Sequence, residues 1–259
     1  MERALQKLNW LCDMDGVLIH GGKMVKGADL FLDRLRATGS RFLVITNNSL
    51  STPKDLVRQL GGMGLEVDKS QIWTSALATA HFVQSQCPGG SAFVIGEASM
   101  HEALGQVGYH EDKVDPDYVV LGETQHYSFD DFSTAIGLIE RGSRFVATNP
   151  EATGPGPTGS LPGCGAMAQL IQSATGVKPY FVGKPNPVMI REGINLLGAD
   201  IESTVIIGDR LETDILSGVE AGLRTILVLS GVARLDQINR LPYRPSRVIA
   251  SVADLIDEL

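Results

Sequence analysis

Short apolar runs alternate with longer amphipathic segments along most of the chain. The runs are rich in β-branched residues and bounded by turn residues, a pattern typical of buried strands, and they cover residues 8–12, 41–45, 204–207 and 225–229. The amphipathic segments predict helices that begin near Pro53 and Pro187, and a third helix over residues 214–221. Strands and helices that alternate in this way predict an α/β fold, with parallel strands joined by right-handed crossovers.

A second α/β series occupies the middle of the chain, from about residue 89 to residue 178. It predicts strands over residues 92–95, 118–121 and 144–148, and helices over residues 99–105 and 128–141. A run rich in glycine and proline follows at residues 153–163, and we expect it to form a long loop because such a run suits neither a helix nor a central strand. We interpret this middle region as a domain inserted into the first one.

The composition narrows the classes of function. The formal net charge of -8 argues against a general nucleic-acid-binding protein, which needs a basic surface to meet phosphates. A phosphate site in this chain must therefore carry its own local positive charge, from a metal ion or a well-placed lysine. Three scattered cysteines favour a reduced compartment, and residues 1–10 lack the apolar stretch of a signal peptide, so we expect a cytoplasmic protein without a membrane segment.

Polar residues follow three of the expected strands directly. Asp13 and Asp15 come after the first strand, Thr46, Asn47 and Asn48 after the second, and Asp209 after the one that ends near residue 207. Because the carboxyl ends of parallel strands share one edge of an open sheet, where ligands bind, we expect these residues to converge on one site.

The three aspartates suit the chemistry of phosphate esters. Asp13, Asp15 and Asp209 offer the oxygen-rich surroundings that Mg²⁺ prefers. A carboxylate beside a metal can attack phosphorus and form an aspartyl-phosphate, and a second carboxylate can act as general acid and base. Thr46 and the loop amides near Asn47 can donate to phosphoryl oxygens, while Lys184 can neutralise their charge.

Each of these positions also has an ordinary structural explanation. An Asp-x-Asp after a strand is often a turn or a helix cap, and Thr46 with its two asparagines fits an Asx-type turn. A lysine between glycine and proline is usually solvated, and Asp214 suits the first turn of a helix. The shared order and the placement at strand ends favour a common site over these separate explanations.

The same residues resemble the motifs of a known superfamily. The stretch from Asp13 to Leu18, the pair Thr46-Asn47, then Lys184, and finally Gly208-Asp209 with Asp214, are similar to the four ordered motifs of the haloacid dehalogenase superfamily of phosphatases. The insert between the second and third motifs resembles the large C2-type α/β cap of subclass IIA. The resemblance covers nearly the whole chain from about residue 11, and it implies a Rossmann-like core with a parallel sheet, formed by residues 1–88 and 179–259, and a cap formed by residues 89–178.

The resemblance also implies a role for each acidic residue. Asp13 would be the nucleophile and a ligand of Mg²⁺. Asp15 would be the general acid and base, and it would bind the metal through its backbone carbonyl. Asp209 would bind the metal directly, and Asp214 would support the metal's water shell.

The substrate implied by the resemblance is a small phosphorylated metabolite. Thr46 and Asn47 would hold the phosphoryl group, and Lys184 would neutralise it and orient the nucleophile. Nucleoside monophosphates such as UMP are the first expectation. A broad-specificity phosphatase acting on sugar phosphates, pyridoxal phosphate or phosphoglycolate, and a phosphotransferase, are the alternatives, and homo-oligomer formation stays open.

One region weakens the nucleotide expectation. Residues 154–163 contain no aromatic ring that could stack on a base and no cation, whereas stacking contributes roughly 1–3 kcal/mol per base. Tyr127 or Tyr180 could supply a ring from elsewhere in the chain.

Two other classes of protein fit the sequence less well. A protein that only binds phosphate would not need Asp15 as an acid and base. A phosphorylation-switch receiver would be about half as long and would have no inserted domain.

Overall fold

The computed structural model describes residues 8–156 and 159–259, so most of the N-terminal segment, residues 1–7, lies outside the described residues. The chain divides into two compact units. The first unit comprises the residues up to 46 together with residues 53–73 and 184–259, and the second unit comprises residues 47–52 and 74–183. The sequence predicts the insert at residues 89–178, whereas this division also places residues 47–52, 74–88 and 179–183 in the second unit.

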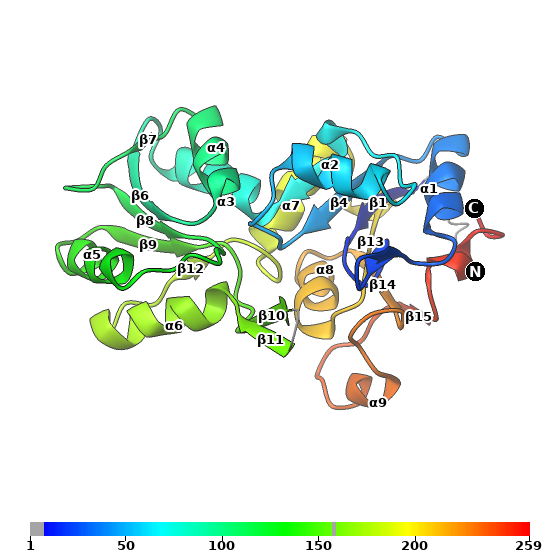
Figure 1. Ribbon diagram of the computed structural model, residues 1–259. Coiled ribbons are helices and arrows are strands. Elements are labelled where there is room, and N and C mark those ends of the chain that lie inside the picture. The colour runs from blue at the N-terminus through cyan, green and yellow to red at the C-terminus, as the bar shows by residue number, and fades with distance from the viewer. Residues whose placement is uncertain (1–7, 157–158) are drawn as a thin grey trace. The chain divides into compact units, whose positions relative to one another are not determined.

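A six-stranded sheet forms the centre of the first unit, in the order β15-β14-β13-β1-β4-β5 (Figure 1). The strand pairs from β15 across to β4 are parallel, and Leu11 of β1 pairs with Ile206 on one side and Leu43 on the other. The strands of this sheet are β1 (Asn9–Cys12), β4 (Phe42–Thr46), β5 (Ile72–Thr74), β13 (Thr204–Gly208), β14 (Arg224–Val228) and β15 (Arg247–Ile249). The parallel α/β core predicted from the apolar runs is therefore confirmed.

Helices cover both faces of this sheet. Phe31 of α1 and Leu56 of α2 join a core cluster with Trp10 of β1, on one face. On the other face a β-carbon on Gly193 of α7 would touch the side chains of Leu11 and its neighbours, which brings that helix close to the strands. The helices of the first unit are α1 (Ala28–Ala37), α2 (Pro53–Gly61), α7 (Pro187–Leu197), α8 (Leu216–Glu220) and α9 (Leu235–Ile238).

Two of the predicted helices begin as the sequence indicated, and one does not. Asn186 caps α7 by accepting from Val188 N at 3.0 Å, and Gly198 ends the helix in the left-handed region. The third helix begins earlier than residue 214, with a π-helical turn over Leu211–Ile215 that continues into α8.

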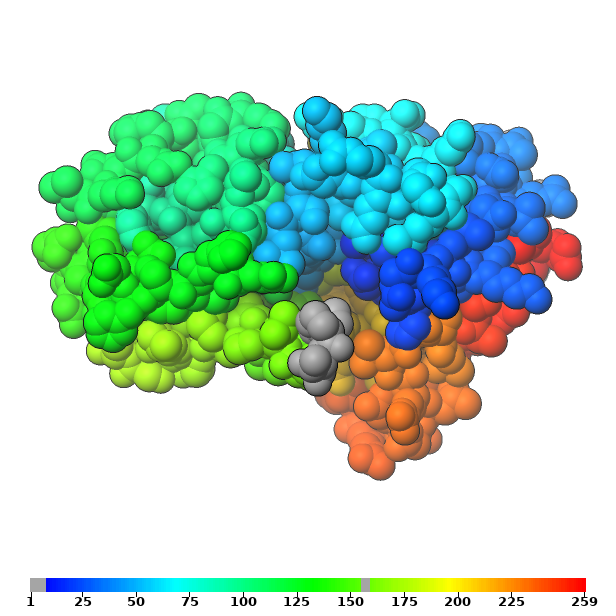
Figure 2. Space-filling model, in the orientation of Figure 1, coloured from blue at the N-terminus to red at the C-terminus, as the bar shows by residue number. Residues whose placement is uncertain are grey.

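The segment around α9, coloured orange, protrudes from the surface of the first unit (Figure 2).

The second unit has its own parallel sheet, in the order β12-β9-β8-β6-β7. Helices α3 and α4 lie on one side of it, and α5 and α6 on the other (Figure 1). The elements are α3 (Ser75–Gln86), β6 (Ser91–Ile95), α4 (Ala98–Gln106), β7 (His110–Glu111), β8 (Tyr118–Leu121), α5 (Phe129–Glu140), β9 (Arg144–Ala147), α6 (Cys164–Thr175) and β12 (Tyr180–Phe181). Because α3 packs against α4, residues 75–86 belong with this unit.

The glycine- and proline-rich run is not a structureless loop, which corrects the sequence expectation. It forms an antiparallel pair, β10 (Thr153–Gly156) with β11 (Gly159–Pro162), in which Thr153 pairs with Pro162. A two-stranded ribbon has a free edge on each strand, so proline costs no ladder hydrogen bond where it faces that edge.

A second hairpin, β2 (Ile19–His20) with β3 (Lys23–Met24), follows β1 in the first unit. No helix in the described part of the chain is long and apolar enough to cross a membrane.

Candidate functional site

Asp13 and Asp15 follow β1 directly, as the sequence predicted, but their surroundings differ. Asp13 is buried, and its backbone N–H donates to Ile207 O of the neighbouring strand at 2.9 Å. Asp15 is exposed, and its side chain makes no hydrogen bond with any residue that the structure describes. Gly16 then turns the chain with a φ of 81°, a conformation that favours glycine. The two carboxylates therefore stand at one strand end, one enclosed and one accessible.

Lys184 links two of the predicted carboxylates. Its buried ammonium donates to Asp13 Oδ1 at 2.6 Å and to Asp214 Oδ1 at 2.6 Å, and also to Ile45 O at 3.2 Å. Desolvation lowers the pKa of this lysine, but the two aspartates outweigh it and leave the pKa well above its ordinary value. Lys184 is therefore a fixed positive charge and not a solvated loop residue.

Asp209 and Asp214 reach the same place from the end of β13. Asp209 follows the last residue of the strand, and Asp214 lies on the π-helical turn. That turn brings the Asp214 side chain so close to Gly208 that any β-carbon there would collide with it. Arg210 N donates to Asp214 Oδ2 at 3.0 Å, so both oxygens of Asp214 have partners. A π-turn inside a helix often marks a functional site, and here it points an acidic side chain inward.

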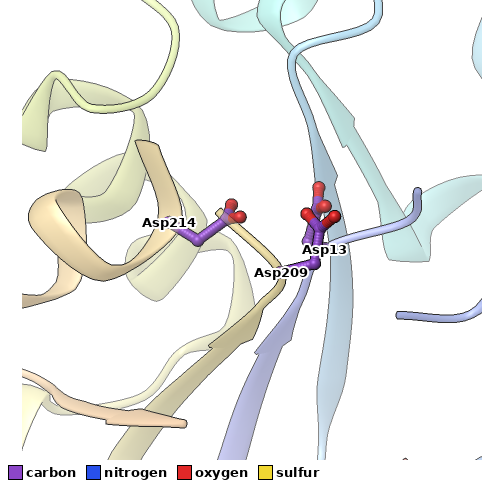
Figure 3. A group of neighbouring side chains, drawn as sticks. All are labelled: Asp13, Asp209 and Asp214. Atoms are coloured by element: carbon purple, nitrogen blue, oxygen red, sulfur yellow. The ribbon is translucent and has the colours of Figure 1, made fainter. Parts of the chain in front are cut away.

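Asp13, Asp209 and Asp214 form what we name the carboxylate cluster. One carboxylate oxygen of each lies within 4.8 Å of the others, and all three residues are buried. Asp13 and Asp209 lie side by side at adjacent strand ends, and Asp214 points toward them from the helical side (Figure 3). Among the residues that the structure describes, Asp209 Oδ1 is buried without a hydrogen-bond partner.

The pKa values of three aspartates at this site are raised. Burial is the largest cause that raises the pKa of Asp13 well above its ordinary value, and the charge of Asp214 adds to it, while Lys184 lowers it. Burial and Asp214 likewise raise the pKa of Asp209 to about 6. Partial desolvation by the surrounding protein also raises the pKa of Asp15, although its side chain is accessible. The charges of Lys184 and Arg210 lower this pKa but do not cancel the effect.

These residues fit a hard divalent cation. Three buried carboxylates against one ammonium leave an excess of negative charge, which the protein interior disfavours unless a cation or protons neutralise it. Asp209 Oδ1, which has no hydrogen-bond partner in the described part of the chain, is an available ligand oxygen at the cluster. Carboxylate oxygens are ligands that Mg²⁺ prefers.

Thr46 and Asn47 are divided between the two units. Thr46 is the buried last residue of β4, in the first unit. Asn47 belongs to the second unit, where its side-chain amide donates to Glu151 Oε1 at 2.8 Å and its backbone carbonyl accepts from Ser75 Oγ at 2.7 Å. The structure therefore brings Thr46, but not the Asn47 side chain, into the unit that holds the carboxylate cluster.

Three further residues are linked to Asn47 by hydrogen bonds, directly or through one another, and the sequence predicted no role for them. Asn149 Nδ2 donates to Glu151 Oε2 at 2.9 Å and to Glu123 Oε1 at 3.3 Å. We name Asn47, Glu123, Asn149 and Glu151 the amide–carboxylate network. The signal was the cluster of amide and acidic residues after β8 and β9, but residues so far apart in sequence meet only once the second sheet is formed.

Comparison with known proteins identifies relatives of the chain. Sequence models of haloacid dehalogenase-like hydrolases match residues 10–110 and 181–255. The chain is 52% identical over 250 residues to dihydroxyacetone phosphatase from Corynebacterium glutamicum, which covers 96% of this chain and 91% of the relative. It is 33% identical over 253 residues to an acid sugar phosphatase of Staphylococcus aureus, with 96% and 97% of the two chains covered.

A third relative has a solved structure. Ribonucleotide monophosphatase NagD from Escherichia coli is 43% identical over 247 residues, which is 95% of this chain and 97% of that protein. The structure of NagD superimposes with a TM-score of 0.90 over 95% of this chain and 97% of the other.

Proposed function

The chain belongs to the haloacid dehalogenase-like hydrolase family and is a phosphatase that resembles NagD, and we propose that it hydrolyses small phosphate monoesters through an aspartyl-phosphate at Asp13. One observation carries the proposal. The buried carboxylate of Asp13 stands at a strand end, hydrogen-bonded to the ammonium of Lys184 at 2.6 Å, beside two further carboxylates. A nucleophile, a fixed positive charge and donors for a divalent cation are thus available within one unit.

A Mg²⁺ ion is part of this proposal. Asp13, Asp209 and the backbone carbonyl of Asp15 would hold it, and Asp214 would support its water shell. When bound, the ion supplies positive charge against the oxygens of the phosphoryl group. Its neutralising effect suits a cluster in which the pKa of Asp13 and that of Asp209 are both raised.

Asp13 and Asp15 divide the chemistry between them. An Asp13 oxygen attacks phosphorus, the bond from phosphorus to the ester oxygen breaks, and the departing alkoxide takes a proton from Asp15. Asp15 then accepts a proton from water as that water attacks the aspartyl-phosphate, and this releases inorganic phosphate and restores Asp13. The exposure of Asp15 and its raised pKa both support this role, because a group that carries a proton must reach the leaving group.

Neutral hydrogen-bond donors and one lysine would bind the phosphoryl group. The Thr46 hydroxyl and the backbone amide at Asn47 would donate to the phosphoryl oxygens, because the Asn47 side-chain amide already donates to Glu151. Lys184 holds Asp13 in position and balances the charge of the group being transferred.

We propose a small substrate without a large aromatic group, such as a triose or sugar phosphate. The ring of Tyr127 stacks on Phe132 with centroids 5.6 Å apart, and Tyr180 stacks on Phe82 at 4.7 Å, so each of these rings already packs against an aromatic neighbour. The relatives named as a dihydroxyacetone phosphatase and an acid sugar phosphatase support this choice. Nucleoside monophosphates, the sequence prediction, stay the second candidate because of the likeness to NagD.

The wider setting completes the proposal. We assign the second unit to the inserted cap of the family, with no nucleic-acid or membrane partner. Cys12, Cys87 and Cys164 are all free thiols, which supports a reducing cytoplasm as the location. Phosphotransfer to an acceptor alcohol is an alternative fate of the same aspartyl-phosphate.

A substrate screen tests the proposal. Phosphate release would be measured from dihydroxyacetone phosphate, a hexose phosphate, UMP, pyridoxal phosphate and phosphoglycolate, with Mg²⁺ and with a chelator. We expect Mg²⁺-dependent release with the highest kcat/KM for a triose or sugar phosphate. A clear preference for UMP would select the second candidate, and no release from any ester would contradict the proposed activity.

A further inference from the structure

The loop that follows β14 holds Asp209 in place. This loop, Ser230 to Ala233, connects β14 to the protruding segment around α9. Val232 N donates to Asp209 Oδ2 at 2.8 Å, and Ala233 N donates to the backbone carbonyl of Asp209 at 3.0 Å. Two consecutive amides of this loop therefore hold one aspartate at both its side chain and its backbone.

Two glycines confine the same carboxylate. A β-carbon on Gly16 or on Gly231 would collide with the Asp209 carboxyl group, and the nearest atom in both cases would be Oδ2. Ser230 Oγ ties the two sides together by donating to Gly16 O at 2.6 Å. The Asp209 side chain thus fits between the turn after β1 and the loop after β14, where only glycine leaves enough room.

The two oxygens of Asp209 are therefore in different surroundings. Oδ2 is held by the loop, while Oδ1 is buried and has no hydrogen-bond partner among the described residues. A carboxylate whose orientation is already fixed loses less rotational freedom when its other oxygen binds a cation.

We propose that the loop Ser230–Ala233 orients Asp209 Oδ1 for the divalent cation, with Ser230 and Gly231 as its positioning residues. This inference rests on the proposed Mg²⁺ dependence of the site and extends it to residues that touch neither the cation nor the substrate. Groups that orient a metal ligand typically change metal affinity by roughly 10- to 100-fold when they are removed.

The test measures binding of Mg²⁺ alone to the metal-free enzyme by titration calorimetry, together with the thermal midpoint of that form. We expect Ser230→Ala to weaken Mg²⁺ binding roughly tenfold and Gly231→Ala to weaken it more, because the added methyl group displaces Asp209. Ser230→Thr keeps the hydroxyl group and should restore most of the affinity. Ser251→Ala is the matched control, since Ser251 lies in the same unit and its Oγ accepts from Ala253 N at 3.3 Å, the one hydrogen bond that this oxygen makes with the described residues.

The outcomes separate this inference from the proposed function. If the wild type hydrolyses phosphate esters with Mg²⁺ but Ser230→Ala and Gly231→Ala bind the ion as tightly as wild type, the loop proposal is overturned and the function stands. Variants that lose thermal stability without losing Mg²⁺ affinity also overturn the loop proposal, because the loop then serves only the fold. If the wild type binds Mg²⁺ but releases no phosphate, the proposed function fails while the affinities still decide the role of the loop. A wild type that does not bind Mg²⁺ overturns both.

Discussion

The two units pair their clustered carboxylates in different ways. In the carboxylate cluster of the first unit, the ammonium of Lys184 pairs with Asp13 and Asp214. The third acid, Asp209, has one oxygen without a hydrogen-bond partner among the described residues. In the amide–carboxylate network of the second unit, both oxygens of Glu151 accept from amides, one from Asn47 and one from Asn149. The first arrangement is charged and incompletely paired, whereas the second is closely paired.

We propose that this difference separates a reactive site from a structural one. Buried charge without full compensation is costly and is characteristic of sites that bind ions or transfer groups. A carboxylate whose two oxygens each accept from an amide, as those of Glu151 do, is stable without any further partner. We therefore expect substitutions in the carboxylate cluster to alter catalysis by orders of magnitude and those in the network to act mainly on stability.

Asp13→Asn should have the largest effect on catalysis. The amide is nearly isosteric but cannot attack phosphorus, so turnover of p-nitrophenyl phosphate should fall on the order of 10⁴-fold or more. The thermal stability of the metal-free protein should not fall, because the change removes a negative charge from a buried cluster that has an excess of it. Steady-state rates and a thermal melt of the metal-free protein check both parts, and near-normal turnover would remove Asp13 from the nucleophile role.

Asp15→Asn should come next, and its effect should depend on the leaving group. Loss of a general acid and base typically costs 10²- to 10⁴-fold. An alkyl phosphate needs a proton on its departing oxygen far more than p-nitrophenyl phosphate does, so the first step should slow more for the alkyl ester. Burst kinetics with both esters measure that step, and equal slowing would argue against proton donation by Asp15.

Lys184→Met should lower both activity and stability. Removal of a charge that stabilises the transition state typically costs roughly 10²- to 10³-fold in rate. It also leaves Asp13 and Asp214 without their shared buried cation, which typically costs about 3–5 kcal/mol. Urea unfolding of the metal-free protein measures that loss. Unchanged stability would mean that the two aspartates do not depend on Lys184.

Glu151→Gln tests the other half of the comparison. The variant can still accept from one amide, either that of Asn47 or that of Asn149, but not from both, so unfolding free energy should fall by roughly 1–3 kcal/mol. Turnover of p-nitrophenyl phosphate should change far less than in any variant of the carboxylate cluster. Glu140→Gln, on the exposed end of α5, is the control. A rate loss as large as that of Lys184→Met would merge the two regions into one site.

The smallest effect is a pH dependence that involves Glu123. Burial raises the pKa of Glu123 above its ordinary value, and nearby Glu151 raises it further, against a lowering hydrogen bond from Asn149. The folded protein then holds this proton more tightly than the unfolded chain, so the contribution to stability is full at low pH and is lost as pH rises through the folded pKa. Unfolding free energies of wild type and Glu123→Gln from pH 4 to pH 8 should therefore diverge in favour of the variant as pH rises. Parallel curves would contradict this.

The sequence predicted the strand ends and the residues on them, because a parallel sheet gathers the ends of its strands whatever lies between them. Asp13, Thr46 and Asp209 follow from that rule. The double contact of Lys184 did not follow, because it depends on the π-helical turn that brings Asp214 inward. No periodicity in the sequence distinguishes that turn from ordinary helix.

The second unit was less predictable. Its helices follow their apolar spacing, as α5 does over Phe129–Glu140. The placement of α3 and Asn47 in this unit depends on contacts between segments far apart in sequence, such as that between Asn47 and Glu151. Pairing between β10 and β11 was missed because glycine and proline disfavour strands in a wide sheet but are tolerated in a narrow ribbon.

The central claim is that Asp13 carries the phosphoryl group during turnover. Borohydride reduces an acyl phosphate to an alcohol, so an aspartyl-phosphate trapped by rapid quenching becomes homoserine at that position. Mass spectrometry of the peptide containing Asp13 and Asp15, after turnover with Mg²⁺ and substrate, should find homoserine at position 13 and none at position 15. The same treatment without substrate should leave the peptide unchanged. Homoserine at another aspartate, or none in an enzyme shown to be turning over, would contradict the account.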